Sequence, residues 1–199
     1  MTTAMCTPEQ DLQILREMLV PDMILEPETG VDGKPRLRLT DPDNPNACVT
    51  ITGLLPHTLA VKSDRAACIS RCFQSSRGEA RRADYILICA GEKERWVVFV
   101  ELKGSMKYTS FHGLASQLLG SRCFFEYVRC TGRMFWACPG FLSAYAERYV
   151  VFPRSSRRGG SRLFGASAGG TGFGSMGCTG VDGVQKIGER MGVRFRRMV

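Results

Sequence analysis

The chain contains few histidines and no long apolar run, and both absences limit what it can be. Its 199 residues include only two histidines, His57 and His112, and they complete no convincing Ser/His/Asp or Cys/His set. No stretch approaches the roughly 18 to 20 consecutive apolar residues of a membrane span. Residues 1–6 have no basic start leading into an apolar segment. We therefore expect a soluble, unexported cytoplasmic protein without a membrane partner.

The cysteines lack the spacing of a disulfide framework or a zinc site. There are nine of them, an odd number at irregular intervals, which favours reduced thiols in the cytoplasm. One close pair, Cys68 and Cys72, has no second pair to complete a zinc site. Cys89 and Cys138 lie in apolar, strand-like runs and are predicted to be buried thiols.

Acidic residues are scarce only toward the C-terminus. The formal net charge is +8, and residues 151–199 hold 9 Lys and Arg against 2 acids, whereas residues 1–150 hold 18 against 17. Residues 159–183 also contain 10 of the 22 glycines. We expect a domain at residues 1–153 and a Gly-rich, basic extension at residues 154–199. That extension should be flexible in part and bind polyanions without specificity.

Hydrophobic periodicity predicts an α/β domain. Thr7, Pro8 and Gln10 have the form of a capping box and should open a helix that ends before Pro21. Strands are predicted at residues 36–39, 47–52, 85–89, 96–100, 134–138 and 149–152, and further helices at residues 110–128 and 141–149. The aromatic residues Phe124, Phe125, Phe135 and Trp136 are predicted to lie in the core.

The two apolar runs at residues 85–89 and 96–100 are the clearest local pattern. They are rich in β-branched and aromatic residues and are joined by the polar residues 91–94, so they predict a hairpin buried on both faces. Symmetric closure places Ala90 opposite Arg95 and, further along, Asp84 opposite Glu101. Since side chains alternate along a strand, Lys103 should share the face of Glu101.

Two carboxylates and a lysine would then converge at one end of the sheet. Carboxylates this close repel each other when ionised, and their burial is costly unless a cation or proton compensates. Oxygen ligands suit Mg²⁺ or Mn²⁺, and a nearby lysine can help to deprotonate water and offset charge on a phosphoryl oxygen. Metal-dependent phosphodiester hydrolysis is the chemistry that fits these groups.

This part of the sequence resembles the core of the PD-(D/E)xK nuclease superfamily. The resemblance is carried by Asp84, by Glu101-Leu102-Lys103 at the end of an apolar strand, and by a following helix with Gln117. The resemblance covers about residues 81–127. It implies a restriction-endonuclease-like fold, a central mixed β-sheet of about four or more strands flanked by helices. It further implies that Asp84 and Glu101 bind Mg²⁺ and that Lys103 is catalytic.

Other expected site residues follow from the same resemblance. Many members place an acid on an N-terminal helix, for which Glu17 is favoured over Glu9 and Glu79. Gln117 would orient substrate or the lysine, although Ser121 stands where some branches carry a tyrosine, and Ala83 replaces the first motif's proline. Arginine and lysine near the acids are predicted to contact phosphates, since they offer charged donors; these are Arg77, Arg81, Arg82 and Lys107.

The sequence therefore predicts a Mg²⁺-dependent endonuclease whose partner is nucleic acid, with DNA favoured. Because nucleases that cut two strands often pair symmetric subunits, a homodimer is one expected assembly. Two alternatives stay open. The first is an inactive nuclease-fold module that binds nucleic acid or a protein. The second is an unrelated structural protein in which Asp84, Glu101 and Lys103 form an ion-pair network at the edge of a sheet.

Overall fold

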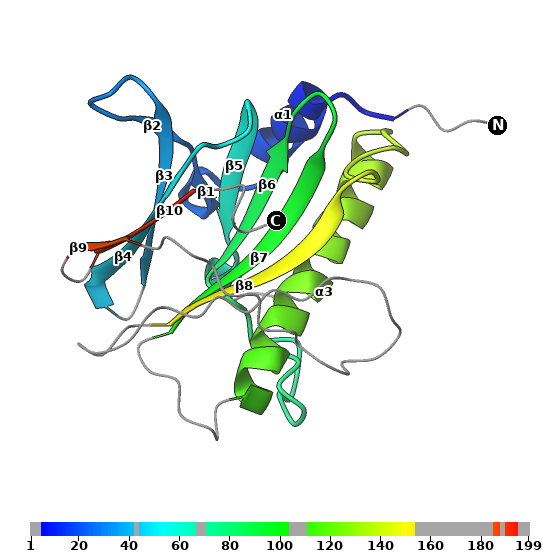
Figure 1. Cartoon of the computed structure of the whole chain (residues 1–199). Coiled ribbons are helices and arrows are strands. Elements are labelled where there is room, and N and C mark those ends of the chain that lie inside the picture. Colours follow the sequence, from blue (N-terminus) through cyan, green and yellow to red (C-terminus); the bar gives the residue numbers. More distant parts are fainter. Residues whose placement is uncertain are drawn as a thin grey trace.

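The computed structural model describes residues 5–41, 44–66, 71–103, 111–153, 185–187 and 190–194, which form two sheets and two α-helices (Figure 1). The elements in chain order are α1 Pro8–Met18, the 3-10 helix η1 Pro21–Met23, β1 Ile24–Leu25, β2 Glu28–Thr29, β3 Pro35–Asp41, β4 Asn44–Thr52, β5 His57–Lys62, the 3-10 helix η2 Ser63–Arg65, β6 Tyr85–Ala90, β7 Arg95–Lys103, α3 Phe111–Phe135, β8 Ala146–Pro153, β9 Gln185–Ile187 and β10 Arg190–Arg194.

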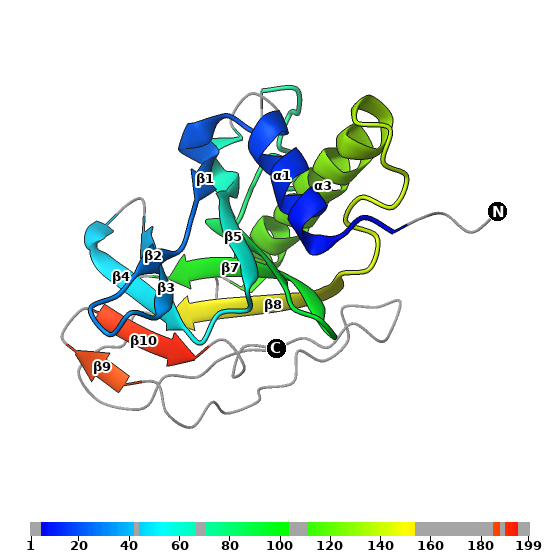
Figure 2. The same cartoon turned by 90° about the horizontal axis from the view of Figure 1, so that it is seen from above.

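The central sheet has five strands in the order β1-β5-β6-β7-β8. Strands β5, β6 and β7 run antiparallel to one another, and β8 lies parallel to β7. A parallel neighbour requires a crossover, which α3 supplies. Both α1 and α3 cover one face of this sheet (Figure 2). The expected α/β architecture, a mixed sheet flanked by helices, is confirmed.

The predicted hairpin and its register are confirmed. Ala90 lies opposite Arg95 and Tyr85 opposite Val100, and the Gly91 N–H donates to the Glu94 carbonyl oxygen at 2.8 Å across the turn. Every residue of β6 is buried, as expected of a strand covered on both faces. Burial raises the pKa of the Cys89 thiol to about 12, so this cysteine acts as a small hydrophobe.

The first helix begins where its capping box predicts. The Gln10 N–H donates to Thr7 Oγ1 at 3.2 Å, and the Thr7 N–H donates to Gln10 Oε1 at 2.9 Å. Leu12 and Leu15 then bury the inner face of α1. The helix ends at Met18, ahead of Pro21, because proline cannot continue a helical hydrogen-bond ladder.

A second sheet, in the order β2-β3-β4-β10-β9, covers the opposite face of the central sheet (Figures 1 and 2). Leu37, Leu39 and Ile51 are fully buried there against the side of the central sheet turned away from the helices. The Tyr85 hydroxyl links the two sheets, because it donates to the Thr40 carbonyl oxygen at 2.7 Å and accepts the Thr40 N–H at 3.1 Å.

The C-terminal extension contributes to this second sheet. Strand β10 lies parallel to β4, with Arg190 opposite Cys48, and antiparallel to β9. The C-terminal extension was predicted to be flexible in part. Most of it, residues 154–184, lies outside the described residues. The division at residue 153 therefore leaves two strands on its far side.

Three sequence-based predictions about the segment around residue 135 are wrong. Residues 134–138 do not form a strand, since α3 continues to Phe135. Met134 and Phe135 are 73% and 80% exposed, so Phe135 is not a core residue, although Phe124 and Phe125 are buried as predicted. Residues 141–149 are not a helix: a turn leads directly into β8. A short apolar run fits the end of a helix as well as a strand.

Cys6 and Cys138 form a disulfide that joins the chain before α1 to the turn after α3. The prediction that Cys138 is a buried thiol in a strand is wrong, because Cys138 is disulfide-bonded and lies in the turn after α3. In the part of the chain that the structure describes, no helix combines the length and apolar character of a membrane span.

Candidate active site

The two predicted metal-binding carboxylates lie at one end of the central sheet. Asp84 directly precedes β6, and extending the register of the hairpin by one pair places it opposite Glu101 of β7. Facing residues of this kind have Cβ atoms about 4.5–5.5 Å apart. Asp84 is 9% exposed and Glu101 is 1% exposed. The structure therefore brings two carboxyl groups together in a nearly dry position.

A backbone hydrogen bond fixes Asp84 against the neighbouring strand. The Leu102 N–H donates to Asp84 Oδ2 at 2.6 Å, which turns the carboxylate toward the segment that holds Glu101. A hydrogen bond from a backbone donor stabilises the ionised form of a carboxyl group. Asp84 is thus held at the sheet end by a contact that does not require any other side chain.

Three aspartates lie near the Tyr85 hydroxyl at this end of the sheet. The pKa of the Tyr85 hydroxyl is raised first by burial, and the charges of Asp84, Asp64 and Asp41 raise it further. Negative charge opposes formation of a phenolate, and the same field attracts a cation. Asp84, Asp64 and Asp41 are thus close enough to Tyr85 to influence its hydroxyl.

Two buried serines hold the residue before Asp84. The Ala83 N–H donates to Ser121 Oγ of α3 at 2.7 Å, and Ser63 Oγ of η2 donates to the Ala83 carbonyl oxygen at 2.5 Å. The two hydroxyl oxygens are themselves 3.1 Å apart, and both serines are fully buried. This serine clamp, Ser63 with Ser121, fixes the backbone from which Asp84 projects.

Gln117 lies next to the serine clamp. Its side-chain Nε2 donates to the Arg82 carbonyl oxygen at 3.4 Å, and its backbone carbonyl oxygen accepts the Ala83 N–H at 3.0 Å. Gly120 permits this close approach of α3, since a Cβ there would lie 1.8 Å from the Arg81 carbonyl oxygen. The described contacts of Gln117 thus position the irregular segment that precedes Asp84.

The two predicted lysines are described only in part. Lys103 is the last residue of β7, opposite Pro153 of β8, and its side chain lies outside the described residues. Lys107 lies outside them entirely. The structure thus places the backbone of Lys103 two residues beyond Glu101, as the pattern requires.

The three predicted arginines differ in where their side chains lie. Arg82 is 9% exposed, and its Nη1 donates to the carbonyl oxygens of Glu79 and Arg81 at 3.0 and 2.8 Å. Burial lowers the pKa of this guanidinium. Arg82 Nη1 therefore braces the loop that carries it. Arg77 and Arg81 are exposed on the same segment and can meet a polyanion.

The structure does not bring Glu17 to the two carboxylates. Its Oε1 and Oε2 accept hydrogen bonds from Gln13 Nε2 at 2.7 Å and Trp136 Nε1 at 2.8 Å. Trp136 follows the C-terminal end of α3, about 22 Å of helix beyond Ser121. The described residues contain no group of three or more His, Cys, Asp or Glu side chains that could hold a metal ion. The third acid expected at Glu17 is therefore not supplied by α1.

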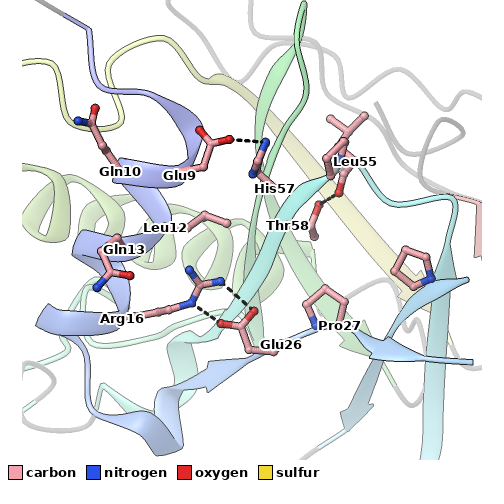
Figure 3. A pocket seen from close by; sticks show the side chains of 12 residues that line it. Glu9, Gln10, Leu12, Gln13, Arg16, Glu26, Pro27, Leu55, His57 and Thr58 are labelled. Atoms are coloured by element: carbon pink, nitrogen blue, oxygen red, sulfur yellow. Dashed lines mark hydrogen bonds and ion pairs between the residues drawn. The ribbon is translucent and has the colours of Figure 1, made fainter.

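The described cavity of about 530 Å³ lies elsewhere, beside α1 (Figure 3). Its polar walls are already paired: His57 Nε2 lies 3.0 Å from Glu9 Oε1, and Arg16 binds Glu26 through two nitrogens. His57, which lines the cavity, is the first residue of β5. Lys62, the last residue of β5, pairs with Tyr85, which follows Asp84. The length of β5, roughly 17 Å, therefore separates the cavity from the carboxylates.

The donor set at the sheet end suits a divalent cation. Asp84 and Glu101 supply carboxylate oxygens, the ligands that Mg²⁺ and Mn²⁺ prefer. Mg²⁺ commonly binds through one or two protein carboxylates and keeps several waters. The two buried acids that the described residues supply are therefore compatible with Mg²⁺.

Sequence reasoning missed the serine clamp. The sequence pattern draws attention to Ser121 only through its spacing from Gln117, and no pattern distinguishes Ser63. One signal for Ser121 was available, since a serine on the apolar face of the predicted helix needs a buried hydrogen-bond partner. That partner, the backbone of residue 83, could not be identified without the fold.

Comparison of the chain with protein-family models, with curated proteins and with solved structures gives no match. The functional interpretation rests on the residues and geometry of the chain itself.

Proposed function

We propose that this chain is a metal-dependent nuclease that hydrolyses phosphodiester bonds of nucleic acid, with DNA the preferred substrate. The observation that carries the proposal is the facing pair Asp84 and Glu101, both buried, at the end of a central mixed sheet. Buried like charges are costly unless a cation balances them.

Each residue has a distinct role in this proposal. Asp84 and Glu101 would hold Mg²⁺, which supplies Lewis-acid polarisation of a phosphoryl oxygen when bound. Lys103, two residues beyond Glu101, would take up the proton of the attacking water or offset phosphate charge. The serine clamp keeps Asp84 in register, because misplacement by about 1 Å lowers the rates of such reactions strongly.

Nucleic acid is the substrate class that the neighbouring arginines favour. Arg77 and Arg81 are exposed on the segment that leads into Asp84, and arginine binds phosphate oxygens with two donors at once. Contacts of this kind set affinity without reading sequence. We therefore expect binding that weakens steeply as salt is raised.

An inactive module on the same fold is the second candidate. One observation favours it: within the described residues no third metal ligand joins the carboxylate pair. The protein would then hold nucleic acid or another protein without cleaving it. Calorimetric titration of Mn²⁺ separates the two candidates, since the module predicts no binding and the nuclease predicts binding that Glu101→Gln abolishes.

Plasmid nicking tests the catalytic proposal directly. Glu101→Gln, Asp84→Asn and Lys103→Ala should each lower Mg²⁺-dependent nicking of supercoiled DNA by about 10²-fold or more. Glu17→Gln is the matched control, an exposed carboxylate outside the site, and should leave the rate unchanged. Cleavage that is undiminished in both carboxylate variants would exclude the proposed site, and circular dichroism would verify that each variant is folded.

A further inference from the structure

The outward face of α3 carries an uncharged, largely apolar stripe. We define the α3 stripe by its five members, which are all exposed and repeat at intervals of four, four, three and four residues: Leu119, Cys123, Tyr127, Cys130 and Met134. Residues at this spacing lie on one side of a helix. Leu119, Tyr127 and Met134 are 37%, 61% and 73% exposed.

The stripe lies opposite the buried face of α3. Leu118, Phe125 and Val128 pack on the central sheet, and these positions are on the other side of the helix from the stripe. Charged residues are confined to one flank, where Arg122 binds Glu147 at 2.9 Å and Arg129 binds Glu126. A solvent-facing helix surface normally carries charged residues. An uncharged, apolar stripe instead marks a surface for contact with another molecule.

The order of residues in the stripe is self-complementary. Read from either end, an apolar aliphatic residue is followed by a cysteine, and Tyr127 occupies the centre. If two copies of α3 lie antiparallel about a two-fold axis between residues 126 and 127, Leu119 faces Met134 and Cys123 faces Cys130. The two tyrosines then meet at the axis. An isologous contact of this kind needs the same patch on both subunits.

We propose that α3 is a homodimer interface in which the stripes of two copies pack antiparallel. Antiparallel packing also aligns the two helix dipoles favourably, whereas parallel packing opposes them. The stripe spans about 22 Å of helix, a contact at the small end of specific interfaces, so we expect a reversible dimer with a dissociation constant on the order of micromolar. This inference does not depend on the proposed nuclease activity.

Such a dimer would place the two candidate sites far apart. Gln117 and Ser121, which contact the backbone before Asp84, lie in the N-terminal half of α3. An antiparallel partner therefore carries its own site at the opposite end of the helix pair.

Sedimentation velocity on the full chain tests the assembly. The wild type should change from monomer to dimer across micromolar concentrations. Tyr127→Glu places two like charges at the two-fold axis and should weaken dimerisation by about tenfold or more. Val31→Glu is the matched control, since Val31 is an exposed apolar residue in a turn away from α3, and should dimerise as the wild type does. The proposal would be overturned if the wild type remained monomeric at protein concentrations about 100 times the expected dissociation constant. Equal dimerisation by the wild type, Tyr127→Glu and Val31→Glu would also overturn it.

Oxidative cross-linking tests the antiparallel arrangement. Copper-phenanthroline removes two electrons and two protons from a facing thiol pair, so the predicted product is an intermolecular Cys123–Cys130 disulfide. Cys123→Ser and Cys130→Ser should each abolish the cross-linked dimer, whereas Cys72→Ser, which removes an exposed thiol outside the stripe, should retain it. Peptide mapping that finds Cys123–Cys123 or Cys130–Cys130 links, or no stripe link, would contradict the antiparallel model.

Discussion

The two ends of the central sheet each bury acidic groups, but they surround them differently. At the hairpin end Asp11 is fully buried, its Oδ1 accepts the Leu142 N–H at 3.1 Å, and its Oδ2 lies 3.6 Å from an Arg95 nitrogen. At the other end, extension of the hairpin register by one pair places Asp84 opposite a second carboxyl group, Glu101. A carboxylate next to a guanidinium is a structural joint, whereas two facing carboxylates suit the binding of a cation.

The joint at the hairpin end connects three parts of the fold. Arg95 begins β7, donates to the Cys6 carbonyl oxygen at 2.9 Å and lies 5.9 Å from the centre of the Tyr145 ring. Asp11 belongs to α1, and Leu142 to the turn before β8. Because the buried Asp11 and the partly exposed Arg95 together hold all three segments, loss of this pair should destabilise the whole domain.

Loss of the guanidinium should have the largest effect on stability. Arg95→Met leaves Asp11 buried without its cation, and we expect the free energy of unfolding to fall by about 3 kcal/mol. Urea denaturation measures the change. Arg16→Met is the control, since Arg16 and Glu26 form an exposed ion pair that should contribute less than about 1 kcal/mol. If both variants lose the same free energy of unfolding, the Asp11–Arg95 pair contributes no more to stability than an exposed ion pair.

At the Asp84–Glu101 end of the sheet we expect a substitution to have a smaller effect on stability, and of opposite sign. Glu101→Gln removes one of two facing charges. In chelator-treated protein we therefore expect this substitution to raise the free energy of unfolding by about 1 kcal/mol. Added Mn²⁺ should raise the melting temperature of the wild type and leave that of Glu101→Gln unchanged. Destabilisation by Glu101→Gln in chelator would mean that the carboxylate holds the sheet end together, and would remove the contrast between the ends.

The pH dependence of stability should show the smallest difference. Burial raises the pKa of Asp11 above the usual aspartate range, against the lowering effects of the Leu142 N–H, the Tyr145 hydroxyl and Arg95. The folded state therefore binds this proton more tightly than the unfolded state, and the Asp11 contribution to stability is lost as pH rises through the folded pKa.

Comparison of the wild type with Asp11→Asn isolates that contribution. Above about pH 4 the wild type should lose stability relative to the variant until the pH has passed the folded pKa of Asp11, with a slope below about 1.4 kcal/mol per pH unit, the value for one proton. Urea denaturation at several pH values measures the slope. A constant difference between the two proteins would show that Asp11 does not titrate differently on folding.

Local patterns predicted the parts of the fold that depend on neighbouring residues. The capping box at Thr7 and the hairpin around residues 91–94 are both confirmed, because hydrogen bonds between residues close in sequence define them. Strand β5 was not predicted, although it pairs with β6 along its length. Its six residues are flanked by Pro56 and η2, and a short buried strand carries no alternating pattern.

The candidate site was predictable to the same extent. Asp84 and Glu101 were expected to face each other because hairpin register follows from the turn, and their burial agrees with that expectation. The orientation of Arg82 and the separation of Glu17 were not predictable. Both depend on which distant segment lies beside them, the loop carbonyls for Arg82 and Trp136 for Glu17.

The sequence alone determined the helix start, the hairpin and its register, since each depends on contacts within about twenty residues. Only the tertiary structure decided that Ser63 and Ser121 hold Ala83, that Asp11 meets Arg95 and that one face of α3 stays uncovered within the described chain. Those contacts join segments far apart in the chain, and long-range pairing follows from how the whole core packs rather than from any local pattern.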